Sequence, residues 1–317
     1  MPWIAGIDEV GYGPLLGPLV VSTALFEVAD PAVDLWDALS RVVRRRPARD
    51  ALAVCDSKLL HRPDDLRPLE RTAVSFWNAR DGATERTFFE FVSAHCPEAG
   101  DQLAAAPWYA SPGLPLPFAH SPGALDPHAA SLRETLRAAG VRFASLHSAL
   151  VEPPAFNDGV RRLGNKADLL FETSGRLYRR LWDAHGATGA LTVIVGKQGG
   201  RAFYADRLQA LFPDALVLTS GERRGRSDYT VEGSGRRMQL SFVADAEEKH
   251  FPVALASILA KYTREGLMAC FNRWWSGRRP GLRPTAGYHT DALRFLRDTE
   301  DLRRELGIED RSLVRER

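Results

Sequence analysis

Two adjacent acids, Asp8 and Glu9, are the residues whose type and position most clearly indicate chemistry. They follow the apolar run WIAGI, and Gly11 and Gly13 come shortly after them. Paired carboxylates at the end of a strand suit a hard cation such as Mg²⁺, which prefers oxygen ligands and leaves positions for water and phosphate. The alternative from this motif alone is a solvated acidic turn. A dinucleotide-binding loop does not fit, because the spacing is GxGxxxG and the two acids would repel a pyrophosphate.

Motifs for other catalytic classes are missing from the sequence. It holds no GxSxG elbow and no HExxH zinc motif, and its eight histidines are scattered. Cys55, Cys96 and Cys270 are widely spaced and never form a CxxC pair. This spacing argues against a disulfide framework and against a zinc site, so we expect three buried thiols.

The composition is that of a soluble globular protein. The 317 residues are 44% hydrophobic and 26% charged, which fits neither a disordered chain nor a fibre. Apolar runs such as LVVSTALF fall far short of the roughly 20 residues that a membrane span requires. Because the chain begins MPWIAGIDEV, without a basic leader, we expect a cytoplasmic protein. The net charge of +2 does not by itself indicate a nucleic-acid partner.

Hydrophobic periodicity and turn residues predict an α/β fold. The expected strands are 3–8, 17–27, 189–196, 215–220, 228–232 and 238–244, the last two joined across GSG as an added hairpin. The expected helices are 32–45, 158–185, 202–212, 252–275 and 290–305. The alternation of strand and helix over 189–220 predicts parallel pairing of its two strands. Six prolines between 107 and 127 predict a loop.

Five segments, in this order, carry a resemblance to a known family. They are IDEVGYGP at 7–14, DSKLL at 56–60, YADRLQALFP at 204–213, FPVALASILAKYTRE at 251–265 and AGYHTD at 286–291. Together they resemble the type 2 ribonuclease H family (ribonuclease HII), whose members cut the RNA strand of RNA/DNA hybrids. The YxxxLxxxFP pattern is closer to the archaeal and eukaryotic members. The resemblance covers most of 1–60 and 157–291, whereas 62–156 matches little.

The resemblance implies a fold, a cofactor and a partner. The fold is α/β of the ribonuclease H type, a mixed sheet flanked by helices, with a C-terminal helical appendage. We therefore expect an α/β domain at 1–262, in which 62–156 is a divergent insertion, and a helical region at 263–317. The implied cofactor is Mg²⁺ or Mn²⁺ in a two-metal site. The implied partner is an RNA/DNA hybrid or a DNA duplex containing ribonucleotides, not a membrane. The sequence does not indicate an oligomeric state.

The catalytic, metal-binding acids of the family fall on Asp8 and Glu9 and, ten residues before Ser257, on Glu247. That last position is normally aspartate. Asp245 and Glu248 are close enough in sequence to compete for its role, and Asp245 is expected among the metal ligands.

The resemblance also implies substrate contacts. They are expected at Gly11, Tyr12, Gly13, Ser57, Lys58, Lys261, Arg264 and Tyr288. The family's glycine turn, whose backbone contacts the substrate 2′-hydroxyl, is usually GRG, so Tyr12 replaces an arginine. Lys58 of the DSK segment is expected near a phosphate. Tyr288 matches the residue that stacks at the RNA to DNA junction.

One expected metal ligand is missing. The family's third acid ends the strand before the YxxxL helix, and the matching residue here is Gly196. The site therefore has three of the four expected carboxylates. A charge pair at about 4 Å is worth up to about 4 kcal/mol at an effective dielectric constant near 20, so cation affinity should suffer. An engineered change, a natural loss of activity and replacement by another acid such as Glu222 remain open explanations.

Arginines and aromatic residues share the segment 264–283. Five arginines accompany one acid there, with Phe271, Trp274 and Trp275 between them. This mixture fits phosphate neutralisation beside stacking contacts, and it equally fits a helix packed by its tryptophans with its arginines in water. The arginines at positions 223, 224, 226, 236 and 237 are candidates for a second phosphate-contacting strip.

Two functions are consistent with these residues. The first is an endoribonuclease that hydrolyses the RNA strand of RNA/DNA hybrids, or ribonucleotides embedded in DNA, by two-metal-ion catalysis, impaired or inactive here because Gly196 replaces an acid. The second is a hybrid-binding protein on the same fold that does not cleave. A kinase of a related fold is disfavoured, because the sequence shows no phosphate-binding loop.

Overall fold

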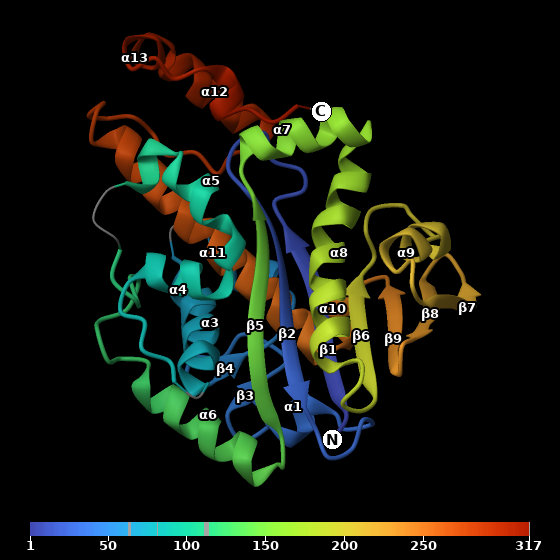
Figure 1. Cartoon of the computed structure of the whole chain (residues 1–317). Coiled ribbons are helices and arrows are strands. Elements are labelled where there is room, and N and C mark those ends of the chain that lie inside the picture. Colours follow the sequence, from blue (N-terminus) through green and yellow to red (C-terminus); the bar gives the residue numbers. More distant parts are fainter. Residues whose placement is uncertain (63–64, 81, 111–113, 317) are drawn as a thin grey trace.

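The computed structural model describes residues 1–62, 65–80, 82–110 and 114–316 and contains one large mixed sheet (Figure 1). The order of its seven strands is β5-β2-β1-β6-β9-β8-β7. Their bounds are β1 Trp3–Val10, β2 Leu19–Glu27, β5 Arg142–Val151, β6 Leu191–Gly196, β7 Leu216–Glu222, β8 Arg226–Gly233 and β9 Arg236–Val243. Two short strands, β3 (Val43–Arg44) and β4 (Leu52–Ala53), form a separate sheet. The predicted α/β class with a mixed sheet is confirmed.

Helices cover both faces of this sheet (Figure 1). The longest helix, α11 (Phe251–Ser276), packs on one face together with α3 (Arg67–Ala79), α4 (Phe88–His95) and α6 (Asp126–Ala138). The other face carries α7 (Pro153–Leu163), α8 (Lys166–His185) and α9 (Ala205–Leu211). The remaining helices are α1 (Leu35–Ala38), α2 (Ser57–Leu60), α5 (Gly100–Ala104), α10 (Ala246–Lys249), α12 (His289–Asp298) and α13 (Glu300–Glu305). None of the helices in the described part of the chain combines the length and the apolar character needed to cross a bilayer.

Side chains of β1 alternate between the two faces, as the two-residue period of a strand requires. Ile4 packs in the core that includes α11, whereas Ala5 and Ile7 pack in the core that includes α8. Gly6 faces α11, and a Cβ atom there would lie 2.0 Å from the carbonyl carbon of Pro252. The absence of a side chain at Gly6 therefore lets the first turn of α11 contact β1, which brings the residues that precede α11 close to β1.

Three parallel strands end at one edge of the sheet. β1 pairs with β6, placing Ile7 opposite Val195, and β6 pairs with β9, placing Gly196 opposite Val243. The residues at and just beyond these three strand ends therefore gather at the same edge, which is where open α/β sheets usually carry their sites.

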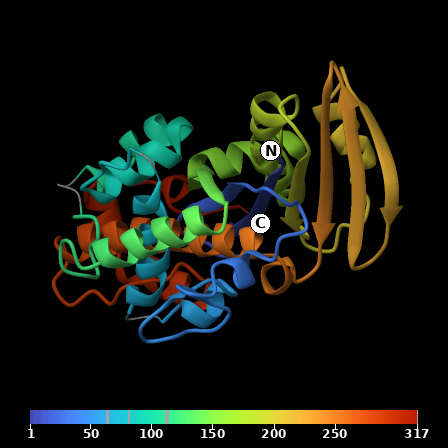
Figure 2. The ribbon, with the colours of Figure 1, turned by 90° about the horizontal axis from the view of Figure 1, so that it is seen from below.

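The predicted hairpin across GSG is present, but one predicted pairing is wrong. β1 and β2 pair antiparallel, and so do β8 and β9. β9 also pairs with β6, so the second hairpin belongs to the main sheet. The parallel pairing expected between 189–196 and 215–220 does not occur, because β9 and β8 lie between β6 and β7. Figure 2 shows the three strands of 216–243, in gold and orange, standing at the opposite side of the molecule from the teal helices.

Three predicted helices differ in their limits. The helix expected at 158–185 is divided into α7 and α8, because Gly164 ends α7 with a positive φ of 81° and Asn165 caps α8 by accepting from the amide of Asp168. The helix expected at 290–305 is divided into α12 and α13 at Thr299. The helix expected at 32–45 shrinks to α1, because the chain turns back at Leu39 and continues into β3.

Segments that the sequence assigned to different regions lie in one sheet and one core. The segment 62–156, predicted as an insertion, contributes β5 to the main sheet, where it pairs along β2. The predicted limit between 262 and 263 falls inside α11, and Phe295 and Leu313 belong to the same core as Ile4. Described residues on both sides of that limit therefore share one core. Within the predicted loop 107–127, residues 111–113 lie outside the described part, and Pro107–Tyr109 forms a 3₁₀ turn. The prediction of three buried thiols is confirmed.

Candidate functional site

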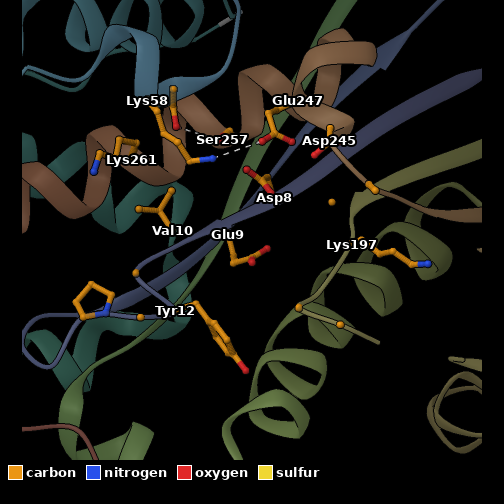
Figure 3. Close-up of a pocket in the computed structure, with 18 of the residues that line it drawn as sticks. Asp8, Glu9, Val10, Tyr12, Lys58, Lys197, Asp245, Glu247, Ser257 and Lys261 are labelled. Carbon is orange, nitrogen blue, oxygen red and sulfur yellow. Dashed lines mark hydrogen bonds and ion pairs between the residues drawn. The ribbon is translucent and has the colours of Figure 1, made fainter. Parts of the chain in front are cut away.

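A cavity of about 600 Å³ lies at the edge where β1, β6 and β9 end (Figure 3). The sequence gives thirteen positions as expected metal ligands, as the missing ligand or as expected substrate contacts. Twelve of these thirteen line the cavity, together with several neighbours. The lining residues are Asp8, Glu9, Val10, Gly11, Tyr12, Gly13, Pro14, Ser57, Lys58, Gly196, Lys197, Gly199, Gly200, Arg224, Ala244, Asp245, Glu247, Ser257, Lys261 and Tyr288. Residues from distant parts of the sequence are thus brought to one pocket.

Asp8 and Glu9 form the acidic floor of this pocket. Burial raises the pKa of Asp8 to about 7, a hydrogen bond from Ser257 acts against this rise, and the charge of Glu247 adds to it. Burial, and next the charge of Asp8, raise the pKa of Glu9 well above its usual range, and Glu247 contributes here as well. The charge of Glu247 therefore acts on both acids, which means that the three carboxyl groups share one electrostatic environment.

Glu247 comes from α10, the short helix immediately before α11. Its carboxylate lies 3.7 Å from the ammonium of Lys58, which also lies 3.8 Å from Asp56 (Figure 3). The side chain of Lys58 is 79% exposed. These neighbouring acids raise the pKa of Lys58 although burial acts in the opposite direction, so Lys58 is a cation at the pocket rim.

The other acids considered in the sequence are placed differently. Asp245 lines the pocket at the rim and has a positive φ of 51°, and its carboxylate lies 3.9 Å from the ammonium of Lys249. Glu248 is exposed and does not line the pocket. Glu222 also lies outside it and accepts a hydrogen bond from the hydroxyl of Tyr229. Glu222 is therefore not placed to replace the missing acid.

Gly196 ends β6 directly beside Asp8. A Cβ atom at this position would lie 2.6 Å from Oδ1 of Asp8, so a longer residue requires that flexible carboxylate to move. An acid at position 196 would consequently place its carboxylate next to that of Asp8.

The glycine turn after β1 forms another wall. Gly11 has a positive φ of 90°, and a Cβ atom there would lie 2.5 Å from the carbonyl oxygen of Pro18, so glycine is required. The ring of Tyr12 faces the ammonium of Lys166, which lies 4.8 Å from the ring centroid. Lys166 therefore brings a positive charge beside Tyr12.

Ser57 of α2 and Lys261 of α11 line another wall of the pocket, and Tyr288, directly before α12, lines the pocket as well. Ser57 is buried and its hydroxyl lies 3.1 Å from that of Ser257. The ammonium of Lys261 lies 3.0 Å from the carboxylate of Glu265. Tyr288 is 50% exposed, so its ring is open to a ligand.

Arg264 is a correction to the predicted substrate contacts. Its side chain is 0% exposed and donates to the carbonyl groups of Leu16 and Ala286, so it cannot reach a substrate in this structure. Trp274 and Trp275 are buried in the core, which favours packing over stacking on a ligand. The arginine strip is also divided: Arg224 lines the pocket, whereas Arg237 lies near the opposite end of the β8–β9 hairpin.

Sequence reasoning did not single out Lys166 or Lys197. Lys197 follows Gly196, and its ammonium donates to the carbonyl groups of Arg223 and Arg224, at 2.7 Å each. It extends away from the acids (Figure 3) and supports the turn that carries Arg224. Its position directly after a buried strand is the signal that could have identified it.

The donor set suits a hard divalent cation in its chemistry, because all of the clustered groups are carboxylates. Burial and the charges of the neighbouring acids raise the pKa values of Asp8 and Glu9, and the charge of Lys58 opposes this rise only in part. Among the described residues, however, no three or more His, Cys, Asp or Glu side chains are arranged closely enough to hold a metal ion. Asp8, Glu9 and Glu247 would therefore have to move closer together around a cation.

The fold and the pocket define an α/β protein with an acidic cleft, rimmed by cations, at the edge where three parallel strands end. Over 102 residues, which are 30% of this chain, the sequence is 34% identical to ribonuclease HII of Pseudoalteromonas atlantica (strain T6c / ATCC BAA-1087). The match spans only 52% of the length of that relative. No protein-family model matches the chain. The resemblance to ribonuclease HII predicted from the five motifs is confirmed by this sequence similarity.

Three solved structures of proteins named as type 2 or type 3 ribonucleases H superpose on this structure. A Bst ribonuclease HIII in complex with Mn²⁺ gives a TM-score of 0.49 at 17% identity, covering 99% of this chain and 65% of the other. A ribonuclease HII from Archaeoglobus fulgidus, in a complex with PCNA, gives 0.42 at 17% identity, covering 99% and 94%. Ribonuclease H2 from Pyrococcus horikoshii OT3 gives 0.47 at 15% identity, covering 98% and 92%. All three scores lie below 0.5.

Proposed function

We propose that this chain is a metal-dependent endoribonuclease that hydrolyses the RNA strand of RNA/DNA hybrids, or ribonucleotides embedded in DNA, with cleavage weakened by Gly196. The observation that carries this proposal is the gathering of Asp8, Glu9 and Glu247 in one pocket with a cationic rim. The similarity to a ribonuclease HII supports the same reaction class.

The rim would bind the nucleic-acid backbone. Lys58 lies on the α2 side of the pocket, and Arg224 lies on the β7–β8 side. Both are exposed, so a phosphodiester strand can lie between them while its charge is neutralised. The acids on the floor then face the same phosphate. Because β1 and α10 are tied together through the close contact of Gly6 with α11, rigid elements hold the acids.

Asp8, Glu9 and Glu247 would hold the cations, with Asp245 at the rim. When bound, divalent cations in such a site lower the pKa of the attacking water and neutralise the leaving oxygen. The carboxylates supply the negative charge that keeps cations in the pocket. Glu247 must exchange its ion pair with Lys58 for this role, which frees the Lys58 ammonium for a phosphate.

Recognition would rest on duplex shape. The backbone of Gly11 and Gly13 and the ring of Tyr12 lie on one wall of the pocket, and the half-exposed ring of Tyr288 is also available. A-form duplexes expose 2′-hydroxyl groups in a shallow minor groove and hide base edges in the major groove. We therefore expect selection of ribose-containing strands without base-sequence specificity.

Gly196 favours a second candidate function, a protein that binds hybrids without cleaving them. A site with three carboxylates in place of four holds cations less tightly, while the rim cations for phosphate binding are intact. The two candidates share one surface and differ only in chemistry.

The test is an assay of wild type and two variants on an end-labelled RNA/DNA hybrid with Mg²⁺ or Mn²⁺. Glu247→Gln should lower cleavage by at least about 100-fold. The matched control is Glu248→Gln, which removes the neighbouring acid outside the pocket and should cleave like wild type. Binding of the hybrid without product for either metal supports the second candidate. Neither binding nor product would overturn both.

A further inference from the structure

Two buried arginines hold the carbonyl groups of the glycine turn that forms one wall of the pocket. The guanidinium of Arg315 donates to the carbonyl oxygens of Gly11 and Gly17, one at each end of the turn. Arg264 donates to the carbonyl of Leu16 at 3.2 Å and to that of Ala286 at 3.0 Å. Arg315 is only 3% exposed. The turn is therefore held from inside the protein at both ends.

The segment that carries Arg315 is itself anchored. Val314 forms a bridge with Leu16, and the amide of Arg315 donates to the carbonyl of Leu15 at 2.9 Å. Asn157 of α7 donates to the carbonyl of Val314 at 2.8 Å and accepts from the amide of Glu316 at 2.7 Å. These bonds hold the 313–316 segment beside the turn. The position of the Arg315 backbone therefore does not depend on the bonds that the Arg315 guanidinium makes.

Burying two guanidinium groups close together costs stability, because each loses water and each repels the other. Burial, and next the charge of Arg264, lower the pKa of Arg315 to about 9, while Glu152 and Tyr109 act in the opposite direction. Arg315 also faces the ring of Phe156, at 4.7 Å from its centroid. The bonds that the guanidinium donates to Gly11 and Gly17 offset part of this cost.

The turn needs external support because of its composition. Gly11 and Gly17 have φ values of +90° and +80°, and residues without a Cβ atom explore much more backbone space than others. Gly11, Tyr12 and Gly13 all face the pocket. Without bonds at both ends, the wall that meets the substrate would fluctuate.

Resting on the proposed function, we propose that Arg315 is a positioning residue: by joining the carbonyls of Gly11 and Gly17, it fixes the turn that discriminates ribose-containing strands from DNA. It does not touch the substrate. Its effect should appear in the preference for a hybrid over a DNA duplex of the same sequence, which a general loss of stability would not alter.

The test compares wild type with Arg315→Gln, Arg315→Lys and the control Arg303→Gln. Arg303 in α13 bonds Asp310 and the carbonyl of Leu296 and does not contact the turn. Two quantities are measured: the rate of amide hydrogen exchange over 11–17, and the ratio of the dissociation constants for hybrid and DNA duplex. In Arg315→Gln, exchange over 11–17 should rise at least tenfold while β6 stays protected, and the preference for hybrid should fall about tenfold. Arg315→Lys should lie between, since one ammonium cannot span both carbonyls.

Unchanged exchange over 11–17 in Arg315→Gln, or a preference for hybrid equal to that of wild type, would overturn the inference. If Arg315→Gln does not fold, Asn157→Ala provides the second route, because it loosens the 313–316 segment while the guanidinium remains. It should raise exchange over 11–17 by a smaller factor, and unchanged exchange there overturns the inference. If wild type shows no preference for hybrid, the proposed function fails, and the exchange data still decide whether Arg315 fixes the turn.

Discussion

The ends of β1 and β6 are neighbours in the sheet and have opposite charge. The last residues of β1 include Asp8 and Glu9, whose carboxyl groups point into the pocket and have raised pKa values. β6, parallel to it, ends in Gly196 and is followed by Lys197, whose ammonium turns away to two carbonyl groups. Backbone geometry alone therefore does not make a cation site. Side-chain identity at each strand end decides whether that end contributes an anion.

The difference extends to the surroundings of the two strand ends. On the β1 side, the cations Lys58 and Lys261 lie beside Glu247 and Glu265 respectively. On the β6 side, Lys197 is held by carbonyl groups, and Arg224 is exposed at the rim. We infer that the β1 side holds cations through its acids and a phosphate through Lys58, whereas the β6 side contributes phosphate contacts without an acid.

The largest effect is expected on removing an acid from the β1 side. Asp8→Asn should lower Mn²⁺ affinity by at least about 100-fold, since even outer-shell changes at metal sites cost 10- to 100-fold. Titration calorimetry with Mn²⁺ measures this, with Asp206→Asn on α9 as a control away from the pocket. Equal affinities for Asp8→Asn and wild type would contradict the assignment.

The second-largest effect is expected when the end of β6 also carries an acid. Gly196→Asp places a fourth carboxylate beside Asp8 and should raise Mn²⁺ affinity and hybrid cleavage by roughly tenfold or more, within the upper bound of about 4 kcal/mol for one charge pair. Gly196→Asn is the control, because it has nearly the same volume without the charge. If both variants behave like wild type, Gly196 does not limit the site.

A smaller effect is expected on the β6 side. Arg224→Gln should weaken hybrid binding a few-fold and reduce the salt dependence of the binding constant by about one unit of slope, as expected for one phosphate contact. Fluorescence anisotropy at several salt concentrations measures this. Arg237→Gln, near the far end of the hairpin, is the matched control. An equal change in both variants would argue against a specific contact by Arg224.

The smallest effect concerns stability in acid. Burial alone would raise the pKa of Glu265, but the bond with His61 and the charges of Arg264 and Lys261 lower it to about 2. Its stabilisation is therefore present above about pH 4.5, its ordinary value, and is lost as pH falls toward 2. The advantage of wild type over Glu265→Gln in the free energy of unfolding should shrink over this range. A difference independent of pH would contradict the pairing.

The sequence allowed prediction of the acids on the β1 side. Asp8 and Glu9 follow a clear apolar run, and the spacing before Ser257 in the resembled family indicated Glu247. The contact that brings them together was not visible in the sequence. Gly6 packs against Pro252, more than two hundred positions away, so closely that a Cβ atom at Gly6 would lie 2.0 Å from the Pro252 carbonyl carbon. A local pattern contains no information about such a contact.

Burial of charged residues was also beyond the sequence. Arg264 was expected to contact the substrate, but it lies inside the core, where it donates to the carbonyl groups of Leu16 and Ala286. Buried arginines are rare, so nothing in the sequence indicated this position. The prediction of a single helix at 158–185 did not include the break at Gly164 and Asn165, although both residue types favour helix ends. β5 was not predicted. The lack of family motifs in 62–156 suggested an insertion, although this region contains the apolar residues of a strand.

The most direct test is the position of Mn²⁺ in crystals grown with the ion, located by its anomalous scattering. The account predicts a peak bounded by the carboxylates of Asp8, Glu9 and Glu247, with the Lys58 ammonium displaced from Glu247. Manganese bound only elsewhere, or a pocket free of it at saturating concentration, would contradict the account.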